Sequence, residues 1–415
     1  MTDDIQLGNA AWLGHGGLAR LLAALDRDGE EARVVGGAVR NALLNLAVDD
    51  IDVATTALPE EVMRRVDAAG WKPVPTGIEH GTITVIIEGE PFEVTTLRQD
   101  VETYGRKAKV MFGRDWRTDA ERRDFTINAL SASAEGKVFD YVGGVADIAA
   151  RRVRFIGDPA KRIAEDYLRI LRFFRFHAWY GVGVPDAAGL HACIVARAGI
   201  ETLSRERLRM ELLKLLLAPH ATPTLVVMTE TGILGAVLGG VALLASFENM
   251  VKVEAATGMQ GDAARRLGAL GVAVREDGER LAQRLRLSNA EAERLIALEH
   301  WWRISPASAD QAAHALLYHL GAQSFADRVL VAWSRSAAAA SDPAWRQLAE
   351  LPQRWTVPHF PLKAADFIHR GLAAGPALGK ALRSAEVAWI AADFPSERGV
   401  LEAIADRAAH QADSG

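Results

Sequence analysis

Asp50 and Asp52, two positions apart, are the first residues of this sequence whose types and spacing suggest chemistry. On a β-strand, residues two apart project to the same face, so the two carboxylates would lie side by side and repel each other. A bound cation relieves that repulsion, and hard oxygen ligands suit Mg²⁺. We therefore expect Asp50 and Asp52 to bind metal and to be the catalytic residues.

A glycine pair precedes these aspartates, between a short apolar run and a helical pattern that extends to Leu46. Gly36 and Gly37 let the backbone approach a ligand closely and leave free amides at a helix N-terminus. Arg40, in the first helical turn, keeps its charge and offers a planar fork suited to phosphate oxygens. A Gly-Gly turn or a D-x-D string alone is common by chance. Their ordered combination predicts a phosphate cradle beside a metal site, as nucleotidyl transfer requires.

The string GGAVRN followed by DDID resembles the signature of the family that comprises class II tRNA nucleotidyltransferases (CCA-adding enzymes) and bacterial poly(A) polymerases. Asn41 departs from that pattern, which usually has an acid there, and we interpret it as a helix-start or loop-anchoring residue. A second match, RRDFTINALSAS from Arg122, follows at the expected distance. In it Arg123 is placed to reach a triphosphate or ribose, and Asp124 to cap a short helix through Ala129. The residues expected to bind the triphosphate or ribose are Gly36, Gly37, Arg40 and Arg123.

The third match is AEDYLRILRFFRF, residues 164–176, within one helix that we expect to begin after Asp158-Pro159. The charged residues at steps of three are Asp166, Arg169, Arg172 and Arg175. At about 3.6 residues per turn, Asp166 and Arg169 share a face. Arg172 is then oblique, and Arg175 lies roughly opposite Asp166. Without the other two matches, this pattern would indicate an exposed, salt-bridged helix face.

A carboxylate beside a guanidinium can discriminate between bases. The carboxylate accepts from an exocyclic amino group, and the guanidinium donates to ring nitrogen or oxygen atoms. Cytosine and adenine show an amino group beside an acceptor nitrogen, whereas guanine and uracil place a carbonyl and an N–H there. One Asp166–Arg169 pair would thus accept CTP and ATP and reject GTP and UTP. The resemblance gives this template role to the E-D-x-x-R motif, residues 165–169, and implies that Arg172 and Arg175 contact nucleotide phosphates or neighbouring groups.

A β-hairpin is expected over Thr82–Ile87 and Phe92–Leu97, which are rich in β-branched residues and are joined by a Glu-Gly-Glu turn. Glu93, on its second strand, would either supply a third carboxylate to the metal site or face solvent.

Residues 98–123 carry charges of both signs, are interrupted by glycines and fit neither a helix nor a strand period. We therefore expect a long charged loop, which is usually functional or mobile. Its aromatic and basic residues suit stacking on RNA and neutralising it. These residues are Tyr104, Phe112, Trp116, Arg106, Lys107, Lys109 and Arg114. The alternative is a disordered insertion, whereas the resemblance implies a flexible loop that helps to switch nucleotide choice.

The composition bounds the class of protein. A chain of 415 residues predicts roughly two to four compact units. The net charge is −5, so any binding of nucleic acid must come from local basic patches. The single cysteine, Cys193, excludes an internal disulfide and fits a reducing cytoplasm. The N-terminus has acids where a signal peptide would have bases, and no apolar run approaches transmembrane length, so we expect a cytoplasmic protein without membrane contact.

The predicted organisation is an α+β nucleotidyltransferase head with an antiparallel-rich sheet, followed by all-α neck, body and tail. The head covers residues 1–157, beginning with a helix around Trp12 to Leu25 and ending with strand, turn and strand from residue 137. The neck, residues 158–225, reads the nucleobase. Residues 226–415 are rich in alanine and leucine, which favours helices, and form a body and tail that bind tRNA.

The resemblance implies attack by an RNA 3′-hydroxyl on the α-phosphate of CTP or ATP, with release of pyrophosphate. Asp50 and Asp52 would hold two Mg²⁺ ions, and the partners would be nucleoside triphosphates and the 3′ end and acceptor arm of tRNA. The expected product is a tRNA that ends in CCA. A poly(A) polymerase shares the catalytic core, although the tail lacks the basic composition expected for gripping arbitrary RNA. CC-only or A-only addition stays open, as does the oligomeric state. A non-catalytic RNA-binding scaffold is the alternative from a different class, and the intact aspartates disfavour it.

Overall fold

The computed structural model describes the chain apart from residues 1–4, 9, 15, 105–106, 309 and 414–415, and apart from the side chains of residues 100–110 and 413. The chain forms two compact units, residues 1–237 and residues 238–415, and each is described by itself. Among the described residues, no helix has the length and apolar character needed to span a membrane.

A seven-stranded sheet forms the centre of the first unit, with strand order β3-β4-β5-β2-β1-β8-β9. Every neighbouring pair is antiparallel except β2 and β5, which are parallel. The strands are β1 (Ala32–Val35), β2 (Asp52–Thr55), β3 (Lys72–Gly77), β4 (Thr82–Ile87), β5 (Glu90–Thr96), β8 (Ser131–Ala132) and β9 (Val138–Phe139). The α+β class with an antiparallel-rich sheet is confirmed, and so is the β4–β5 hairpin.

The register of the central strands brings distant parts of the sequence together. Asp52, the first residue of β2, pairs with Val35 at the end of β1 and with Glu93 on β5. Because Gly36 follows Val35 directly, the glycine turn, Asp52 and Glu93 meet at one place on the sheet. This juxtaposition positions the candidate site.

Residues 98–104 and 107–112 form a second, two-stranded sheet, so the prediction of a long loop over these residues is wrong. β6 (Arg98–Tyr104) pairs antiparallel with β7 (Lys107–Phe112). The mixed charges concealed the strand period because this hairpin pairs with itself and lies outside the seven-stranded sheet.

The residues expected to stack on RNA divide into two groups. Arg106 lies outside the described residues, and so do the side chains of Tyr104, Lys107 and Lys109. The other three contact other parts of the protein. Trp116 is buried, Arg114 pairs with Glu30 at 2.6 Å, and the Phe112 ring packs against Gly81. An RNA-stacking role for Trp116 is therefore wrong.

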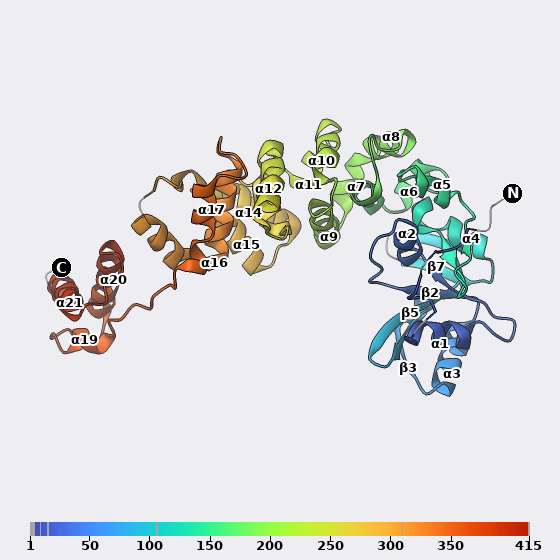
Figure 1. The fold of residues 1–415 in the computed structure, drawn as a ribbon, viewed down its shortest axis with the longest axis horizontal. Helices are drawn as coiled ribbons and strands as arrows, with labels where there is room; N and C mark the ends of the chain where they lie inside the picture. The colour runs from blue at the N-terminus through green and yellow to red at the C-terminus, as the bar shows by residue number, and fades with distance from the viewer. Residues whose placement is uncertain (1–4, 9, 15, 105–106, 309, 414–415) are drawn as a thin grey trace. The chain divides into compact units, whose positions relative to one another are not determined.

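Helices flank the sheet and extend the first unit beyond it. They are α1 (Gly16–Leu25), α2 (Gly37–Leu43), α3 (Pro59–Ala68), α4 (Trp116–Glu121), α5 (Gly144–Ala149), α6 (Pro159–Glu165), α7 (Leu168–Tyr180), α8 (Ala187–Val195), α9 (Arg205–Leu216), α10 (Ala221–Glu230) and α11 (Ile233–Leu238). The first helix starts at Gly16 rather than near Trp12, and α1 and α3 lie side by side (Figure 1). α5 replaces the predicted second strand after residue 137, because the Asp140 carboxylate accepts the backbone N–H groups of residues 142–145 and starts a helix.

The helix predicted to run through residues 159–176 is broken at Asp166, so that prediction is wrong. Asp166 has extended backbone angles (φ −156°, ψ 108°), and its side chain accepts from the N–H of Leu168 to begin α7. The neighbouring Tyr167 ring fills the space that Gly199 leaves, where a Cβ would lie 2.0 Å from the ring. The start of α6 is as predicted, since Asp158 caps it.

An aromatic cluster attaches α7 to the sheet domain. Phe173 of α7 stacks on Phe155 with ring centroids 5.4 Å apart, and Phe176 lies 5.3 Å from Phe125. All four rings are buried. Burial of one such ring stabilises the fold by roughly 1.5–3 kcal/mol, so the start of the helical segment is rigidly joined to the sheet.

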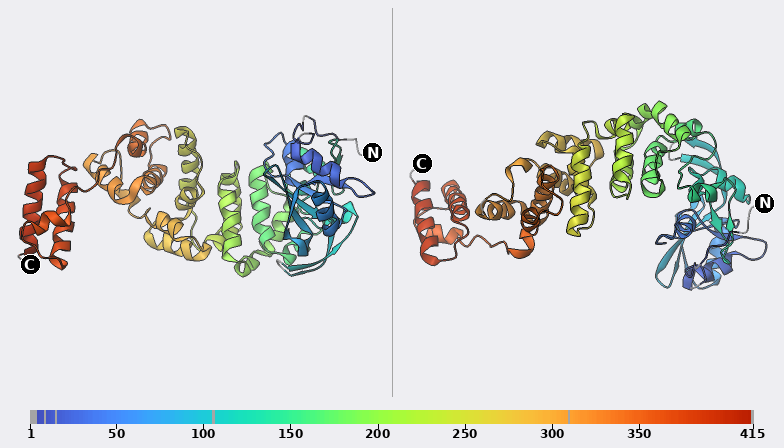
Figure 2. Two further views of the ribbon diagram at one scale, coloured as in Figure 1. Left: turned by 90° about the horizontal axis from the view of Figure 1, so that it is seen from below. Right: turned by 45° about the horizontal axis from the view of Figure 1, so that its top comes forward.

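Over its described residues the second unit is helical, as predicted. Its helices are α12 (Leu244–Thr257), α13 (Ala263–Gly271), α14 (Arg275–Leu285), α15 (Asn289–Ile296), α16 (Asp310–Ser334), α17 (Pro343–Ala349), α18 (Leu351–Arg354), α19 (Ala364–Ile368), α20 (Pro376–Ala391) and α21 (Arg398–Asp413). α16 is kinked at Gly321, and α20 and α21 lie side by side (Figure 2). Trp333 and Trp389 are core residues, whereas Trp302 is exposed.

Candidate active site

One pocket in the first unit is lined by all ten residues that the sequence nominated for catalysis and nucleotide binding. Its volume is about 650 Å³. The lining residues are Gly36, Gly37, Arg40, Asp50, Asp52, Arg123, Asp124, Asn128, Asp166, Leu168, Arg169, Arg172, Arg175, Phe176, Tyr180 and Arg207. Six arginines and four aspartates are among them, a charge balance that suits a polyanion with bound cations.

The glycine turn forms one wall of this pocket. Gly36 has φ 70° and ψ −118°, a conformation that residues with a Cβ rarely adopt. A Cβ there would also lie 3.3 Å from Nη1 of Arg123. The glycine therefore meets a conformational need and leaves room for a guanidinium beside the start of α2.

Arg40 is buried, with 6% of its surface exposed, and is fully engaged by the protein. It donates to the side-chain oxygens of Asn41 and Asn128, and to the Tyr180 hydroxyl at 2.8 Å. Burial lowers the pKa of Arg40, but an arginine stays charged at any physiological pH. The result is a fixed positive charge at the wall of the pocket.

The two catalytic candidates reach the pocket from different backbone settings. β2 begins at Asp52, so Asp50 lies in the loop before the strand, and the prediction that both project from one strand is wrong. Both nevertheless line the same pocket. Glu93 does not line it, but its strand places it beside Asp52 in parallel register, and it is exposed.

The carboxylates repel one another. The pKa of Asp52 is raised from 3.8 to about 6, first by burial and then by the charges of Asp50 and Glu93, while Arg123 opposes the rise. More than a third of the surface of Asp52 is exposed, so solvent screening weakens both the effect of burial and the repulsion. A site that raises the pKa of a carboxyl by crowding carboxylates gains most from a cation.

The carboxylates of the pocket suit a metal ion that is bound partly by substrate. Among the described side chains, no three His, Cys, Asp or Glu residues form a cluster that would hold a metal ion by itself. Mg²⁺ usually binds through one or two carboxylates, waters and substrate phosphates, which matches Asp50 and Asp52 beside an arginine-rich cavity. The residues thus fit Mg²⁺ that arrives with a nucleotide.

Asp124 connects the sheet domain to α7. Its carboxylate accepts from Nε of Arg172 at 2.7 Å and from the Asn128 amide at 3.2 Å. Burial alone would raise the pKa of Asp124, but Arg172 and these hydrogen bonds hold it below its usual value. Asp124 also bonds to the N–H of Phe125, so it anchors the short turn that follows it, Thr126–Asn128.

Asp166 and Arg169 do not pair with each other in the described contacts. Asp166 accepts two hydrogen bonds from Arg207 of α9, at 2.5 and 3.2 Å. Arg169 pairs with Glu165 and donates to the carbonyl of Arg162 at 2.6 Å. Each group of the predicted base-reading pair is thus fixed separately, and both face the same cavity.

Comparison with known proteins identifies the family. Residues 32–154 match the family described as the Poly A polymerase head domain, and residues 191–243 match the probable RNA and SrmB-binding site of polymerase A. The mitochondrial CCA tRNA nucleotidyltransferase 1 of Danio rerio is 33% identical over 383 residues, which cover 90% of this chain and 86% of that protein. The chain belongs to the CCA tRNA nucleotidyltransferase family.

Other members support this placement. The CCA-adding enzyme of Limosilactobacillus fermentum is 33% identical over 376 residues, covering 87% of this chain and 89% of that protein. The crystal structure of the Bacillus stearothermophilus CCA-adding enzyme in complex with CTP is similar with a TM-score of 0.77 and 27% identity, covering 95% of this chain and 98% of that one. As a member of this family the chain is a nucleotidyltransferase, and the predicted enzyme class is confirmed.

Sequence reasoning did not assign a site role to several pocket residues of this family member. Asn128 and Tyr180 hold Arg40, and Arg207 holds Asp166. Glu211, one helical turn after Arg207 on α9, accepts from Arg175 at 2.5 Å. Only the packing of α9 against α7 shows that Arg207 lines the pocket and that Glu211 holds one of the pocket's arginines.

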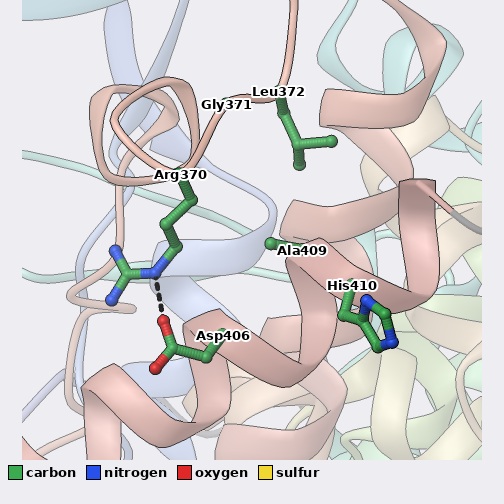
Figure 3. A pocket seen from close by; sticks show the side chains of 6 residues that line it. All are labelled: Arg370, Gly371, Leu372, Asp406, Ala409 and His410. Atoms are coloured by element: carbon green, nitrogen blue, oxygen red, sulfur yellow. Dashed lines mark hydrogen bonds and ion pairs between the residues drawn. The ribbon is translucent and has the colours of Figure 1, made fainter.

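A second hollow lies within residues 238–415, between the end of α19 and α21 (Figure 3). Its volume is about 400 Å³, and an ion pair between Nε of Arg370 and Asp406, 2.7 Å long, crosses its wall.

Proposed function

We propose that this member of the CCA tRNA nucleotidyltransferase family adds C, C and A from CTP and ATP to the 3′ end of tRNA, with release of pyrophosphate. One observation carries the proposal. A single cavity is lined by two carboxylates suited to metal, by arginines suited to a triphosphate and by an aspartate suited to a base edge. The names of both full-length relatives agree with this activity.

Asp50 and Asp52 are proposed to hold two Mg²⁺ ions, with Glu93 as a candidate third carboxylate. When bound, such ions lower the pKa of the attacking hydroxyl and stabilise the leaving pyrophosphate. The crowding that raises the pKa of Asp52 supports this assignment, because a cation would relieve it.

The glycine turn and the arginines are proposed to hold the triphosphate. Gly36 and Gly37 line the pocket at the start of α2, with Gly37 partly exposed, and Arg40 supplies a charge fixed by three polar neighbours. Arg123, which pairs with Asp119 at 3.2 Å, lies against Gly36 and would reach the triphosphate or ribose.

Asp166 and Arg169 are proposed to read the base. The bidentate bond from Arg207 holds the Asp166 carboxylate in one orientation, and its remaining lone pairs can accept the amino group of cytosine or adenine. Glu165 holds Arg169 in the same way. Arg172 and Arg175 would contact phosphates or neighbouring groups, each oriented by an acid, Asp124 and Glu211 respectively.

The remaining chain is proposed to hold the tRNA, with residues 1–157 as catalytic head, residues 158–225 as neck and residues 226–415 as body and tail that contact the acceptor arm. We place the reaction in the cytoplasm. Support comes from the single cysteine, Cys193, because a chain with one cysteine forms no internal disulfide, as is usual for proteins of a reducing compartment.

The experiment is nucleotide incorporation on a tRNA transcript that lacks its 3′ CCA, with Mg²⁺ and each nucleoside triphosphate singly and in pairs. We expect two C with CTP alone and one further A with CTP and ATP. A long A ladder with ATP alone would indicate poly(A) polymerase. CC without A, or A only on a CC end, would indicate a divided activity.

The Asp50→Ala/Asp52→Ala double variant distinguishes an enzyme from a non-catalytic RNA-binding scaffold. Loss of incorporation with retained binding of tRNA supports the metal assignment. Activity that survives both changes would refute it.

A further inference from the structure

Asn41 uses both ends of its side-chain amide. Its Oδ1 accepts from Nη2 of Arg40 at 2.9 Å and from Nε of Arg40 at 3.2 Å. Its Nδ2 donates to the carbonyl oxygen of Ala47 at 2.8 Å. Because an arginine only donates and a carbonyl only accepts, these neighbours fix the orientation of the amide.

The contact with Ala47 lies in the segment that carries Asp50. We call residues 44–51, between α2 and β2, the carboxylate loop. Its backbone is held to the same residue, since the N–H of Leu46 donates to the carbonyl oxygen of Asn41 at 2.9 Å. Asn41 therefore touches the guanidinium on one side and the carboxylate loop on the other.

An acid at this position could make only one of the two side-chain contacts. A carboxylate would accept from Arg40 as the amide does, but its second oxygen would face the Ala47 carbonyl, acceptor against acceptor. The amide is thus chemically matched to its site, although the signature of the family usually has an acid here.

We propose that Asn41 is a positioning residue that couples the Arg40 guanidinium to the carboxylate loop and so sets Asp50 relative to the triphosphate-binding wall. The proposal rests on the proposed function, because it assigns metal to Asp50 and phosphate to Arg40. Asn41 acts through its two neighbours and does not touch substrate.

The test compares Asn41→Asp, which keeps the contact with Arg40, and Asn41→Ala, which loses both contacts. For Asn41→Asp we expect the Mg²⁺ concentration at half-maximal C addition to rise about three- to tenfold, because one hydrogen bond is lost and two acceptors face each other at an exposed contact. The KM for CTP at saturating Mg²⁺ should change less than about twofold, since the bonds that fix Arg40 remain. For Asn41→Ala both quantities should rise.

Two further measurements separate positioning from folding and from charge. Hydrogen–deuterium exchange of the amides in residues 44–51 should be faster in both variants than in the unaltered chain, whether or not the protein is active. Asn45→Asp is the matched control, because it adds the same charge to the exposed part of the same loop at a φ of 55° that Asp tolerates. It should leave the Mg²⁺ requirement and the exchange of the loop unchanged.

The outcomes distinguish this proposal from the proposed function. If the unaltered chain adds no nucleotide, the proposed function fails, and loop exchange alone decides whether Asn41 holds the loop. If the unaltered chain adds CCA but Asn41→Asp matches it in Mg²⁺ requirement and loop exchange, the coupling by Asn41 is refuted. An equal shift in Asn45→Asp would assign the effect to charge and would also overturn the proposal.

Discussion

Replacing Asp52 by Asn should stabilise the metal-free protein while removing its activity. Asn has the same shape but no charge, so the repulsion from Asp50 and Glu93 disappears without leaving a cavity. The stabilisation follows from the direction of the pKa shift, since the pKa of Asp52 is raised in the folded state to about 6.

The sign follows from proton linkage. Between about pH 4 and pH 6 the folded state holds more protons than the unfolded state, so the free energy of unfolding falls as the pH rises through this range. The cost of the charged carboxylate is absent below the unfolded pKa and fully present above pH 6. Asn avoids that cost at every pH.

The size of the stabilisation depends on the pKa shift of Asp52 and on the exposure of its side chain to solvent. A rise of about two pKa units corresponds to about 3 kcal/mol at 1.36 kcal/mol per unit. Because Asp52 is exposed over more than a third of its surface, solvent screening reduces this to about 1 kcal/mol. For a unit of this size, about 1 kcal/mol shifts Tm by about 2–4 °C.

The assay is thermal unfolding of the unaltered chain and of Asp52→Asn at pH 7.5 and pH 4, without metal and with saturating Mg²⁺ and CTP. We expect the variant to have the higher Tm at pH 7.5 without metal, and the gap to close at pH 4. Mg²⁺ with CTP should raise the Tm of the unaltered chain more than that of the variant. Glu90→Gln, which removes a charge from the exposed first residue of β5, is the control and should show none of these differences. An Asp52→Asn variant that is less stable at pH 7.5 would refute the reasoning.

Three further predictions concern the neighbours of this site. Glu93→Gln removes one of the charges that raise the pKa of Asp52. The acidic limb of the pH–rate profile at limiting Mg²⁺, which is expected near pH 6 in the unaltered chain, should therefore move to lower pH. An unmoved limb would show that Glu93 does not act on Asp52. Gly36→Ala places a Cβ on a residue with a φ of 70° and against Arg123. It should lower the free energy of unfolding, measured with urea, by roughly 1–3 kcal/mol and raise the KM for CTP. A variant with unaltered stability would contradict the assigned strain. Arg207→Met removes the partner of Asp166. It should lower the free energy of unfolding in the same urea assay by roughly 1–3 kcal/mol and weaken discrimination between CTP and UTP. Full discrimination would mean that Asp166 reads the base without the hydrogen bonds from Arg207.

Local chemistry explains why much of the fold and the site could be predicted from sequence. The order of apolar run, Gly36-Gly37, helix and D-x-D string specifies a strand, a turn and a second strand within a few residues. The β4–β5 hairpin could be predicted for the same reason, because its two strands and the turn between them are adjacent in the sequence. Each of the ten nominated residues lines the pocket, because each belonged to a string whose neighbours fix its backbone.

Long-range contacts explain what could not be predicted. The break at Asp166 depends on the Leu168 N–H and on Gly199, which accommodates Tyr167 from more than thirty residues away. Helical periodicity alone therefore suggested that Arg169 shares a face with Asp166, whereas Arg207 of α9 is the actual partner of Asp166. Side chains that reach a site across a helix–helix contact carry no signature in their own sequence.

The most direct test is the base selectivity of Asp166→Asn, because one carboxylate is proposed to read both nucleotides. The measurement is kcat/KM for CTP against UTP on tRNA lacking CCA, and for ATP against GTP on tRNA ending in CC. We predict that both selectivities collapse together, since an amide can donate to the carbonyl of uracil or guanine where a carboxylate cannot. Retention of both selectivities, or loss of one alone, would contradict a single reading site for C and A.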